Sequence, residues 1–226
     1  MAKENKNTAV NEKNVEFEEL TSTENFFDKY KNSIILGGVG IVVVLLGFLG
    51  YKKFVSEPNN VESQIEIASA MYDFESDSLT AAVNGVNGNM GFEEAADEYN
   101  GTTGGDIANY SMGIISMEKG EFETALEYFG ECGFEDVMVA NLCLGLQGDC
   151  YVELNEYAKS VDFFEKAAAR EANEYTTPMY LKKAGLAYEA LEDYSKAITV
   201  YTKIKDNYPQ STEGADIQKY IERATK

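Results

Sequence analysis

The side chains best suited to chemistry are three cysteines and 39 acidic residues, in a chain of 226 residues that has no histidine. Cys132, Cys143 and Cys150 lack C-x-x-C spacing, and without histidine they do not form the ligand set of a zinc site. Cys143 and Cys150 would lie about 10.5 Å apart on one helix, which is beyond disulfide reach. We expect buried thiols, and a bridge from Cys132 to either of the others stays open.

The carboxylates have no partners with which to form an active site. No activated serine or cysteine accompanies them, and carboxylates scattered over helix surfaces are normally solvated. We therefore predict no enzyme activity, no catalytic residue, no metal, no cofactor and no small-molecule substrate.

The net charge of −20 is unevenly distributed. Residues 54–158 contain 21 acidic residues and one basic residue, Lys119, whereas residues 159–226 contain 11 of each. Because nucleic-acid affinity comes largely from Lys and Arg, this charge argues against nucleic acid as a partner. A solubilising acidic face without a specific partner is the alternative interpretation.

One apolar stretch, IILGGVGIVVVLLGFLGYKK at residues 34–53, interrupts this polar sequence. The 17 uncharged residues from Ile34 to Gly50 are about the shortest run that spans ~30 Å of hydrocarbon. About 33 residues precede it and no small-x-small cleavage site follows, unlike in a secretory signal. We predict an uncleaved single-pass transmembrane helix within a helical segment 22–55. A cleaved signal and a buried core helix are the alternatives.

Lysines around this segment indicate its orientation. Two lysines stand on each side, Lys29 and Lys31 before it and Lys52 and Lys53 after it. The tail adds Lys3, Lys6 and Lys13, so the positive-inside rule places the N-terminus in the cytoplasm. In a bacterium, the rest of the chain would then lie in the periplasm, attached to the inner membrane.

The N-terminal tail and the anchor have further features. Residues 1–21 are rich in Lys, Glu and Asn and are predicted to be disordered. Thr21 and Glu24 form a T-x-x-E capping box, which predicts a helix from about Ser22. Four glycines fall within roughly 140° of one face of the anchor and would let another helix approach closely: Gly37, Gly40, Gly47 and Gly50.

Beyond the anchor, Pro58, Asn59 and Asn60 are predicted to break the helix. Residues 61–75 then restore helical spacing, with Ile65, Ala68, Met71 or Tyr72, and Phe74 or Glu75 along the register. Turn signals fill residues 77–91, and residues 92–99 predict a short helix.

From Asp106 onward, three windows share the same pattern of residue types. They begin at Asp106, Asn141 and Pro178. Glycine stands at position 8 (Gly113, Gly148, Gly185), and an aromatic residue stands at position 24 (Phe129, Phe164, Tyr201). Position 20 is small (Ala125, Ser160, Ala197), and the polar turns EKGEF, ELNEY and ALEDY divide the windows. Each window is therefore predicted to be a helical hairpin.

This pattern resembles the tetratricopeptide repeat, most closely in the third window, YLKKAGLAYEALEDYSKAITVYTKIKDNYP. The predicted fold is all-α, a single transmembrane helix followed by an α-solenoid of tetratricopeptide-type hairpins in a domain 61–226. The repeats would span about 106–139, 141–174 and 178–211, with a capping helix at 211–225. No window has the family's tryptophan at position 4, and only the third has its closing proline, Pro209.

The layout of tail, anchor and acidic repeat domain resembles the YfgM-like ancillary subunits of the Sec translocon over roughly residues 24–226. This resemblance implies an inner-membrane protein that associates with translocon subunits and with a membrane-anchored periplasmic chaperone of the prolyl-isomerase-like type. It also implies help for newly translocated, unfolded polypeptide. The alternative is a structural coordinator of cell-envelope assembly or division with other protein partners.

The repeat resemblance implies that positions 2, 5, 9 and 12 of each window line a concave groove. Nine residues at these positions are the candidate partner-binding set: Ile107, Tyr110, Ile114, Met117, Asp149, Met179, Lys182, Leu186 and Glu189. We expect Tyr110, Ile114 and Met117 to form a hydrophobic seat, and Asp149 and Lys182 to supply polar selectivity. Alternatively, Ile114 and Met117 are core between repeats or lie under the helix at residues 61–75.

Overall fold

The computed structural model describes residues 29–33 and 35–225. The chain divides into two units, residues 1–57 and 58–226, and each is described by itself. The predicted disordered tail and the capping box of Thr21 and Glu24 lie outside the described residues.

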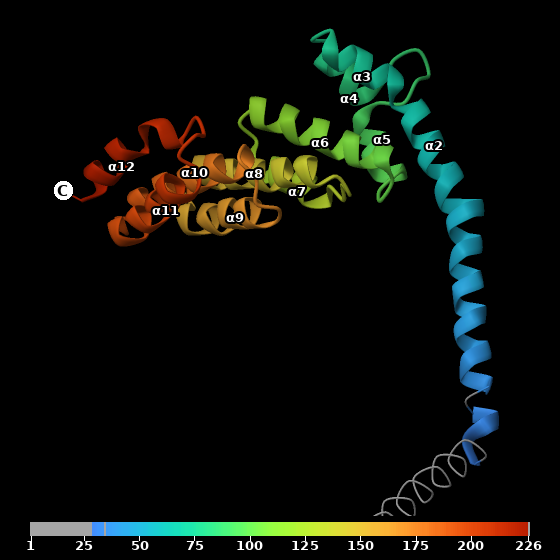
Figure 1. The fold of residues 1–226 in the computed structure, drawn as a ribbon. Helices are drawn as coiled ribbons and strands as arrows, with labels where there is room; N and C mark the ends of the chain where they lie inside the picture. The colour runs from blue at the N-terminus through green and yellow to red at the C-terminus, as the bar shows by residue number, and fades with distance from the viewer. Residues whose placement is uncertain (1–28, 34, 226) are drawn as a thin grey trace, which may run out of the picture. The chain divides into compact units, whose positions relative to one another are not determined.

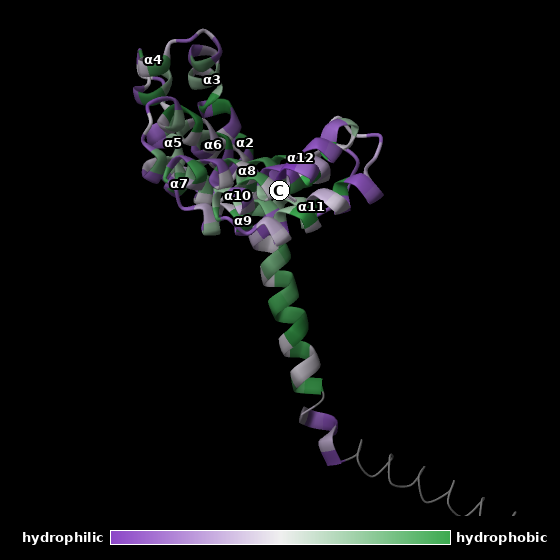
Figure 2. Ribbon diagram, turned by 90° about the vertical axis from the view of Figure 1, so that its left-hand side faces the viewer, coloured by the Kyte–Doolittle hydropathy of each residue, from purple (hydrophilic) through white to green (hydrophobic). Residues whose placement is uncertain are grey.

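An apolar helix makes up the described part of the first unit. By length and composition, one helix, Lys29–Glu75, could cross a membrane, and none of its most apolar window is buried. Figure 2 shows its hydrophobic character along the first unit. A Cβ atom added at Gly37, Gly40, Gly47 or Gly50 would meet no other atom within 4 Å, so these glycines are open to an approaching helix.

The helix continues through Pro58, so the predicted break at residues 58–60 is wrong. A π-helical turn, Lys52–Ser56, is followed directly by α2 (Glu57–Glu66). The Glu57 N–H donates to the Lys52 carbonyl, five residues earlier. Proline lacks an N–H and its ring clashes with the carbonyl four residues before it. In the π-helical turn before Pro58, the N–H groups bond to carbonyls five residues earlier and not four. The bond that proline would break is therefore already absent, and the helix continues.

The second unit begins with four short helices. After α2 come α3 (Ala68–Glu75), α4 (Leu79–Asn84) and α5 (Phe92–Glu98). α5 confirms the short helix predicted at residues 92–99. α4 lies inside the segment predicted as turns. The turns stand on both sides of it, with positive φ at Asp77 before α4 and at Gly85, Asn87 and Gly88 after it.

α2 is attached to the first repeat helix, α6 (Thr103–Glu118), by polar contacts. The Thr103 N–H donates to Asn60 Oδ1 at 2.6 Å, and the Gly104 N–H donates to Ser63 Oγ at 3.2 Å. These bonds satisfy amides that the first turn of a helix leaves without partners. A Cβ at Gly104 would lie 2.5 Å from the Ser63 backbone, so only glycine allows this approach.

The buried face of α2 and α3 differs from the predicted register. Ile67 and Ala70 are buried, together with Ser63, whereas Ile65 is 67% exposed and Tyr72 is 70% exposed. Because the bonds from α6 hold Ser63, the face that carries Ser63 turns toward the domain and the predicted face turns away.

Three helical hairpins follow, side by side (Figure 1). They pair α6 with α7 (Phe122–Glu131), α8 (Val137–Glu153) with α9 (Tyr157–Ala169), and α10 (Thr176–Ala190) with α11 (Tyr194–Asn207). A 3-10 turn, Gly214–Asp216, leads to the last helix, α12 (Ile217–Ala224), which packs on α11. The described residues are helical apart from their turns and loops, which agrees with the predicted all-α class.

Each hairpin closes on a contact between a glycine and an aromatic ring. A Cβ at Gly113 or Gly148 would lie 2.5 Å from the ring of Phe129 or Phe164, and a Cβ at Gly185 would lie 2.2 Å from the ring of Tyr201. These are positions 8 and 24 of the three windows, so the repeated spacing in the sequence is confirmed as a packing contact.

The turns within the hairpins also repeat. Position 15 of each window has positive φ: 76° at Gly120, 60° at Asn155 and 60° at Glu192. Glycine and asparagine tolerate this left-handed conformation, whereas glutamate is strained there.

The Gly148→Ala variant is expected to lose about 1–3 kcal/mol of unfolding free energy, because its methyl group would overlap the Phe164 ring. Gly130→Ala is the matched control, since a Cβ there meets nothing and alanine favours a helix by ~0.5–1 kcal/mol. Urea unfolding of the full chain in detergent, followed by circular dichroism, measures both. Equal stability of the two variants would refute the packing argument.

The Glu192→Gly variant is expected to gain about 1 kcal/mol of unfolding free energy, because glycine removes the steric cost of positive φ. The same urea titration measures this change. Asn155→Gly serves for comparison and should gain less, because asparagine already tolerates the left-handed region. A Glu192→Gly midpoint below that of the wild type would contradict the expectation.

Candidate functional site

The predicted hydrophobic seat on α6 is half-buried. Tyr110, Ile114 and Met117 pack against a small core that contains Phe129 of α7 and Cys150 of α8. The Tyr110 ring lies 6.2 Å from the Phe129 ring, and burial raises the pKa of its hydroxyl. These side chains thus fill the space between the first two repeats. This agrees with the alternative interpretation, in which Ile114 and Met117 are core between repeats. Their contact with a partner stays a prediction.

Ile107 lies nearer the start of α6 and belongs to a different cluster. It is half-buried against the core that α3, α4, α5 and α6 share, which includes Phe92 and Ala108. The four apolar groove positions of the first window are therefore divided between two cores.

Asp149 and Lys182, which are predicted to supply polar selectivity, each bind another residue of the repeat unit. The Asp149 carboxylate binds Lys183, whose Nζ lies 2.8 Å from Oδ1 and 2.6 Å from Oδ2. Lys182 Nζ lies instead 3.5 Å from Asp216 and 4.7 Å from the centre of the Tyr220 ring. Neighbouring residues on a helix point about 100° apart, so Lys183 reaches back to α8 while Lys182 faces the terminal segment.

Glu189 is likewise engaged by the terminal helix. Its carboxylate accepts hydrogen bonds from the Tyr201 hydroxyl at 2.6 Å and from Arg223 at 2.8 and 2.9 Å. Burial and this carboxylate raise the pKa of Tyr201. Lys182 and Glu189 therefore attach α12 to α10, and they are not open groove positions.

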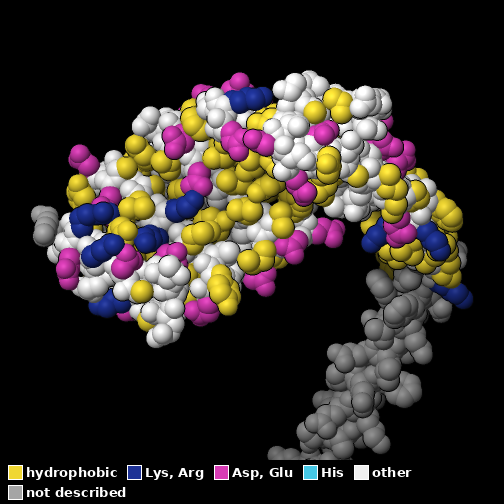
Figure 3. Space-filling model, turned by 90° about the horizontal axis from the view of Figure 1, so that it is seen from above, with side chains coloured by type: hydrophobic (Ala, Val, Ile, Leu, Met, Phe, Trp, Pro, Cys, Tyr) yellow, Lys and Arg dark blue, Asp and Glu magenta, His cyan; other side chains and the backbone are white. Residues whose placement is uncertain are grey.

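Several apolar side chains of the repeats remain exposed at the starts of α8 and α10 and further along α10. Met138 is 52% exposed and Leu142 39% on α8, Leu186 is 41% exposed on α10, and Tyr175 just before α10 is 82% exposed. Seen from above, hydrophobic side chains gather in a band along the middle of the repeat unit (Figure 3). We refer to Met138, Leu142, Tyr175, Met179 and Leu186 as the apolar repeat face.

Sequence reasoning missed Met138 and Tyr175 because both precede their windows. The helix starts could have indicated them. Asp136 Oδ1 accepts hydrogen bonds from the Met138 and Val139 amides, and Asn173 Oδ1 accepts them from the Tyr175 and Thr176 amides. Asp136 is the N-cap of α8, which therefore begins before its window, whereas Asn173 holds the turn that precedes α10.

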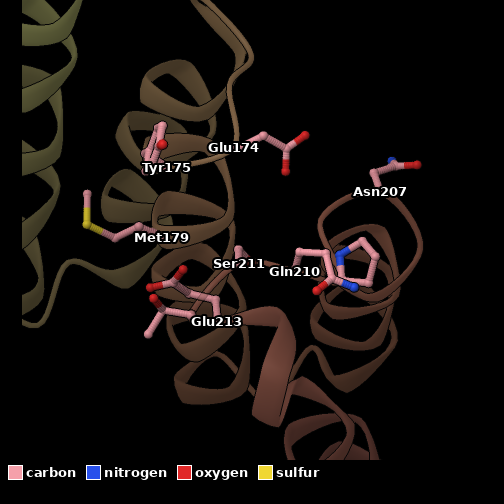
Figure 4. Close-up of a pocket in the computed structure, with 9 residues that line it drawn as sticks. Glu174, Tyr175, Met179, Asn207, Gln210, Ser211 and Glu213 are labelled. Carbon is pink, nitrogen blue, oxygen red and sulfur yellow. The ribbon is translucent and has the colours of Figure 1, made fainter.

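Two hollows adjoin residues of this face. The smaller, of about 190 Å³, is lined by Asp149, Val152, Tyr157, Phe164, Lys183, Leu186 and Ala187. The larger, of about 620 Å³, has Glu174, Tyr175 and Met179 on one side, and Asn207 and residues 209–213 on the other. Figure 4 shows the larger hollow between the start of α10 and the segment after α11.

The linings determine what the hollows can bind. The larger hollow has two carboxylates, Glu174 and Glu213, beside the ring of Tyr175 and the thioether of Met179, with no Lys or Arg in its lining. It suits apolar or cationic side chains of a polypeptide. Among the described residues, no group of three or more His, Cys, Asp or Glu side chains could hold a metal ion.

The cysteines are free thiols, with Cys143 and Cys150 buried and Cys132 half-buried. Burial raises the pKa of Cys150 to about 11. The Cys132 Sγ lies 3.6 Å from the Tyr128 carbonyl oxygen. A hydrogen bond with Cys143 raises the pKa of the Cys132 thiol. Cys132 and Cys150 are therefore held as protonated thiols, which are poor nucleophiles, whereas the contact with Cys132 lowers the pKa of Cys143.

Comparison with known proteins identifies the hairpins. Tetratricopeptide-repeat family models match residues 143–174 and residues 181–211, which are the α8–α9 and α10–α11 hairpins. Among solved structures, the N-terminal domain of stress-induced protein-1 (STI-1) from C. elegans is similar. It is 20% identical, with 54% of this chain and 94% of that chain covered and a TM-score of 0.45. No curated protein matches the chain.

The chain therefore contains tetratricopeptide repeats, and such repeats generally mediate protein–protein interactions. Leu186 lies within a matched repeat, and the other residues of the apolar repeat face precede residues 143 and 181, where the two matches begin. The apolar repeat face and its two hollows form the candidate site for a protein partner.

Proposed function

We propose that this protein is a membrane-anchored tetratricopeptide scaffold that binds polypeptide on its apolar repeat face and acts by binding without catalysis. The observation that carries the proposal is the exposure of Leu142 on α8, of Tyr175 just before α10 and of Leu186 on α10, with Tyr175 lining a hollow of about 620 Å³. Large apolar side chains gathered on one face mark an interaction site. Unfolded polypeptide exposes apolar side chains that such a face can cover.

We further propose that the scaffold is an ancillary subunit of the Sec translocon in the bacterial inner membrane. The apolar helix at the start of the chain, followed by the repeats, supports this assignment, as does the resemblance of this layout to the YfgM-like subunits. The N-terminus would lie in the cytoplasm and the repeats in the periplasm. Its partners would be translocon subunits, a membrane-anchored periplasmic chaperone and emerging polypeptide.

Binding of a permanently unfolded, carboxymethylated protein to the full chain in detergent tests the apolar repeat face. The variant with both Leu142→Asp and Tyr175→Asp is expected to bind about tenfold more weakly in fluorescence anisotropy, because the substitutions place charges on an apolar contact. Leu191→Asp is the control, since Leu191 is 43% exposed but lines neither hollow. Equal losses in both variants would show that the face is not the site.

A photo-crosslinking residue in place of Leu142 in living cells tests the translocon assignment. We expect a product with a channel subunit or with the membrane-anchored chaperone, because Leu142 is exposed on the repeat face. The control places the same residue at Lys203, which is exposed on α11.

The location is checked in the same strain by fusing alkaline phosphatase after Lys226, which should be active in the periplasm. An inactive fusion would reverse the proposed orientation. Crosslinks from Leu142 only to division or assembly proteins would replace the translocon by another partner.

A further inference from the structure

α2 and α3 have two apolar faces, and only one is used within the described structure. The first contains Ile67, Ala70 and Phe74, which belong to the core shared with α4, α5 and α6. The second contains Val61, Ile65, Ala68 and Tyr72, which we call the outer stripe. Val61 is 58% exposed, Ile65 67% and Tyr72 70%, and Ala68 is exposed as well.

The outer stripe is one continuous face. Hydrogen bonds continue the helical ladder from α2 into α3, from the Ile67 N–H to the Ser63 carbonyl at 3.3 Å and from the Met71 N–H to the Ile67 carbonyl at 2.9 Å. At 100° per residue, the four stripe residues fall within roughly 60° of each other, on the side opposite Ile67 and Ala70. The domain core therefore cannot use the stripe.

The spacing of the stripe fits another helix. Its residues are separated by four, three and four positions, which is the alternation of the apolar seam between two packed helices. The seam is short, so a second interaction must add to its affinity.

Charge beside the stripe defines the partner. Glu62, Glu66 and Asp73 lie along one edge, and none of them forms an ion pair within the described residues. No Lys or Arg occurs from residue 54 to residue 118. The nearby Tyr99 experiences this field, because burial and then the charges of Glu62, Glu98 and Glu66 raise its pKa. A second copy of this chain, or an anionic lipid surface, would bring further negative charge against the same edge.

We propose that the outer stripe docks an amphipathic helix of a partner protein, whose apolar residues have the same alternating spacing and whose flank carries Lys or Arg. The apolar seam would position the helix, and its basic flank would pair with Glu62, Glu66 and Asp73. This site is separate from the apolar repeat face and does not depend on the function proposed for that face.

Two synthetic helical peptides serve as probes for the full chain in detergent. Both have leucine at the alternating seam positions, but one carries lysine along its flanks and the other carries glutamate. Fluorescence anisotropy is expected to show the lysine peptide binding about tenfold or more tightly than the glutamate peptide. Ile65→Asp and Tyr72→Asp should each remove binding of the lysine peptide. Tyr194→Asp, at a residue that is 47% exposed on α11, should leave it unchanged.

A charge exchange makes the test specific. The triple variant Glu62→Lys, Glu66→Lys and Asp73→Lys should prefer the glutamate peptide, reversing the order of the two affinities. Circular dichroism and the urea midpoint confirm that each variant is folded. Equal binding of both peptides, binding of neither, or an unchanged preference in the triple variant would overturn the proposal.

Two further outcomes assign the stripe to another occupant and also overturn the proposal. One is self-association of the chain in analytical ultracentrifugation that Ile65→Asp abolishes, which would indicate a second copy. The other is binding of the tagged chain to phosphatidylglycerol vesicles that Ile65→Asp abolishes, which would indicate lipid.

Discussion

The close approach of aromatic rings to glycine backbone is the contact on which the repeat unit depends. Within each hairpin, the ring at position 24 rests where a Cβ at position 8 would otherwise be. The same kind of glycine–aromatic contact joins neighbouring repeats, because a Cβ at Gly145 of α8 would lie 2.2 Å from the ring of Tyr180 in α10. Cores are close-packed, so each ring fixes the distance between two helices.

Glycine and aromatic residues at constant spacing are easy to recognise in a sequence, and the helical hairpins could be predicted for that reason. The face that α2 and α3 bury could not. Both of their apolar stripes satisfy helical periodicity, and the choice between them depends on Ser63 and Asn60, which bond to amides 41 and 43 residues later in the chain. The spacing of apolar residues carries no information about a polar contact between residues so far apart in the chain. Pro58 was misjudged for a related reason, since a local π turn cancels its usual effect.

The candidate site was only partly predictable, because assigning groove positions from the repeat pattern assumes that every repeat has the same neighbours. Lys182 and Glu189 occupy groove positions, but after α11 the chain continues into α12, which binds both. Terminal elements of a solenoid differ from internal ones because one of their faces has no following repeat. At the other end, Tyr110, Ile114 and Met117 fill the space between the first two repeats. What remains exposed is the region in between, at the starts of α8 and α10.

The distribution of ion pairs connects this architecture with the choice of partner. All six ion pairs within the described residues join residues between 149 and 223, in the part of the chain where Lys and Arg are frequent. Of the 21 acidic residues between 54 and 158, only Asp149 and Glu156 belong to these ion pairs, and the segment itself contains one basic residue, Lys119. Like charges held close together oppose a compact state, and salt screens them over about 8–10 Å. A basic partner would relieve this repulsion beside α2 and α3. Its binding should therefore weaken as ionic strength rises, whereas binding to the apolar repeat face should depend on salt far less.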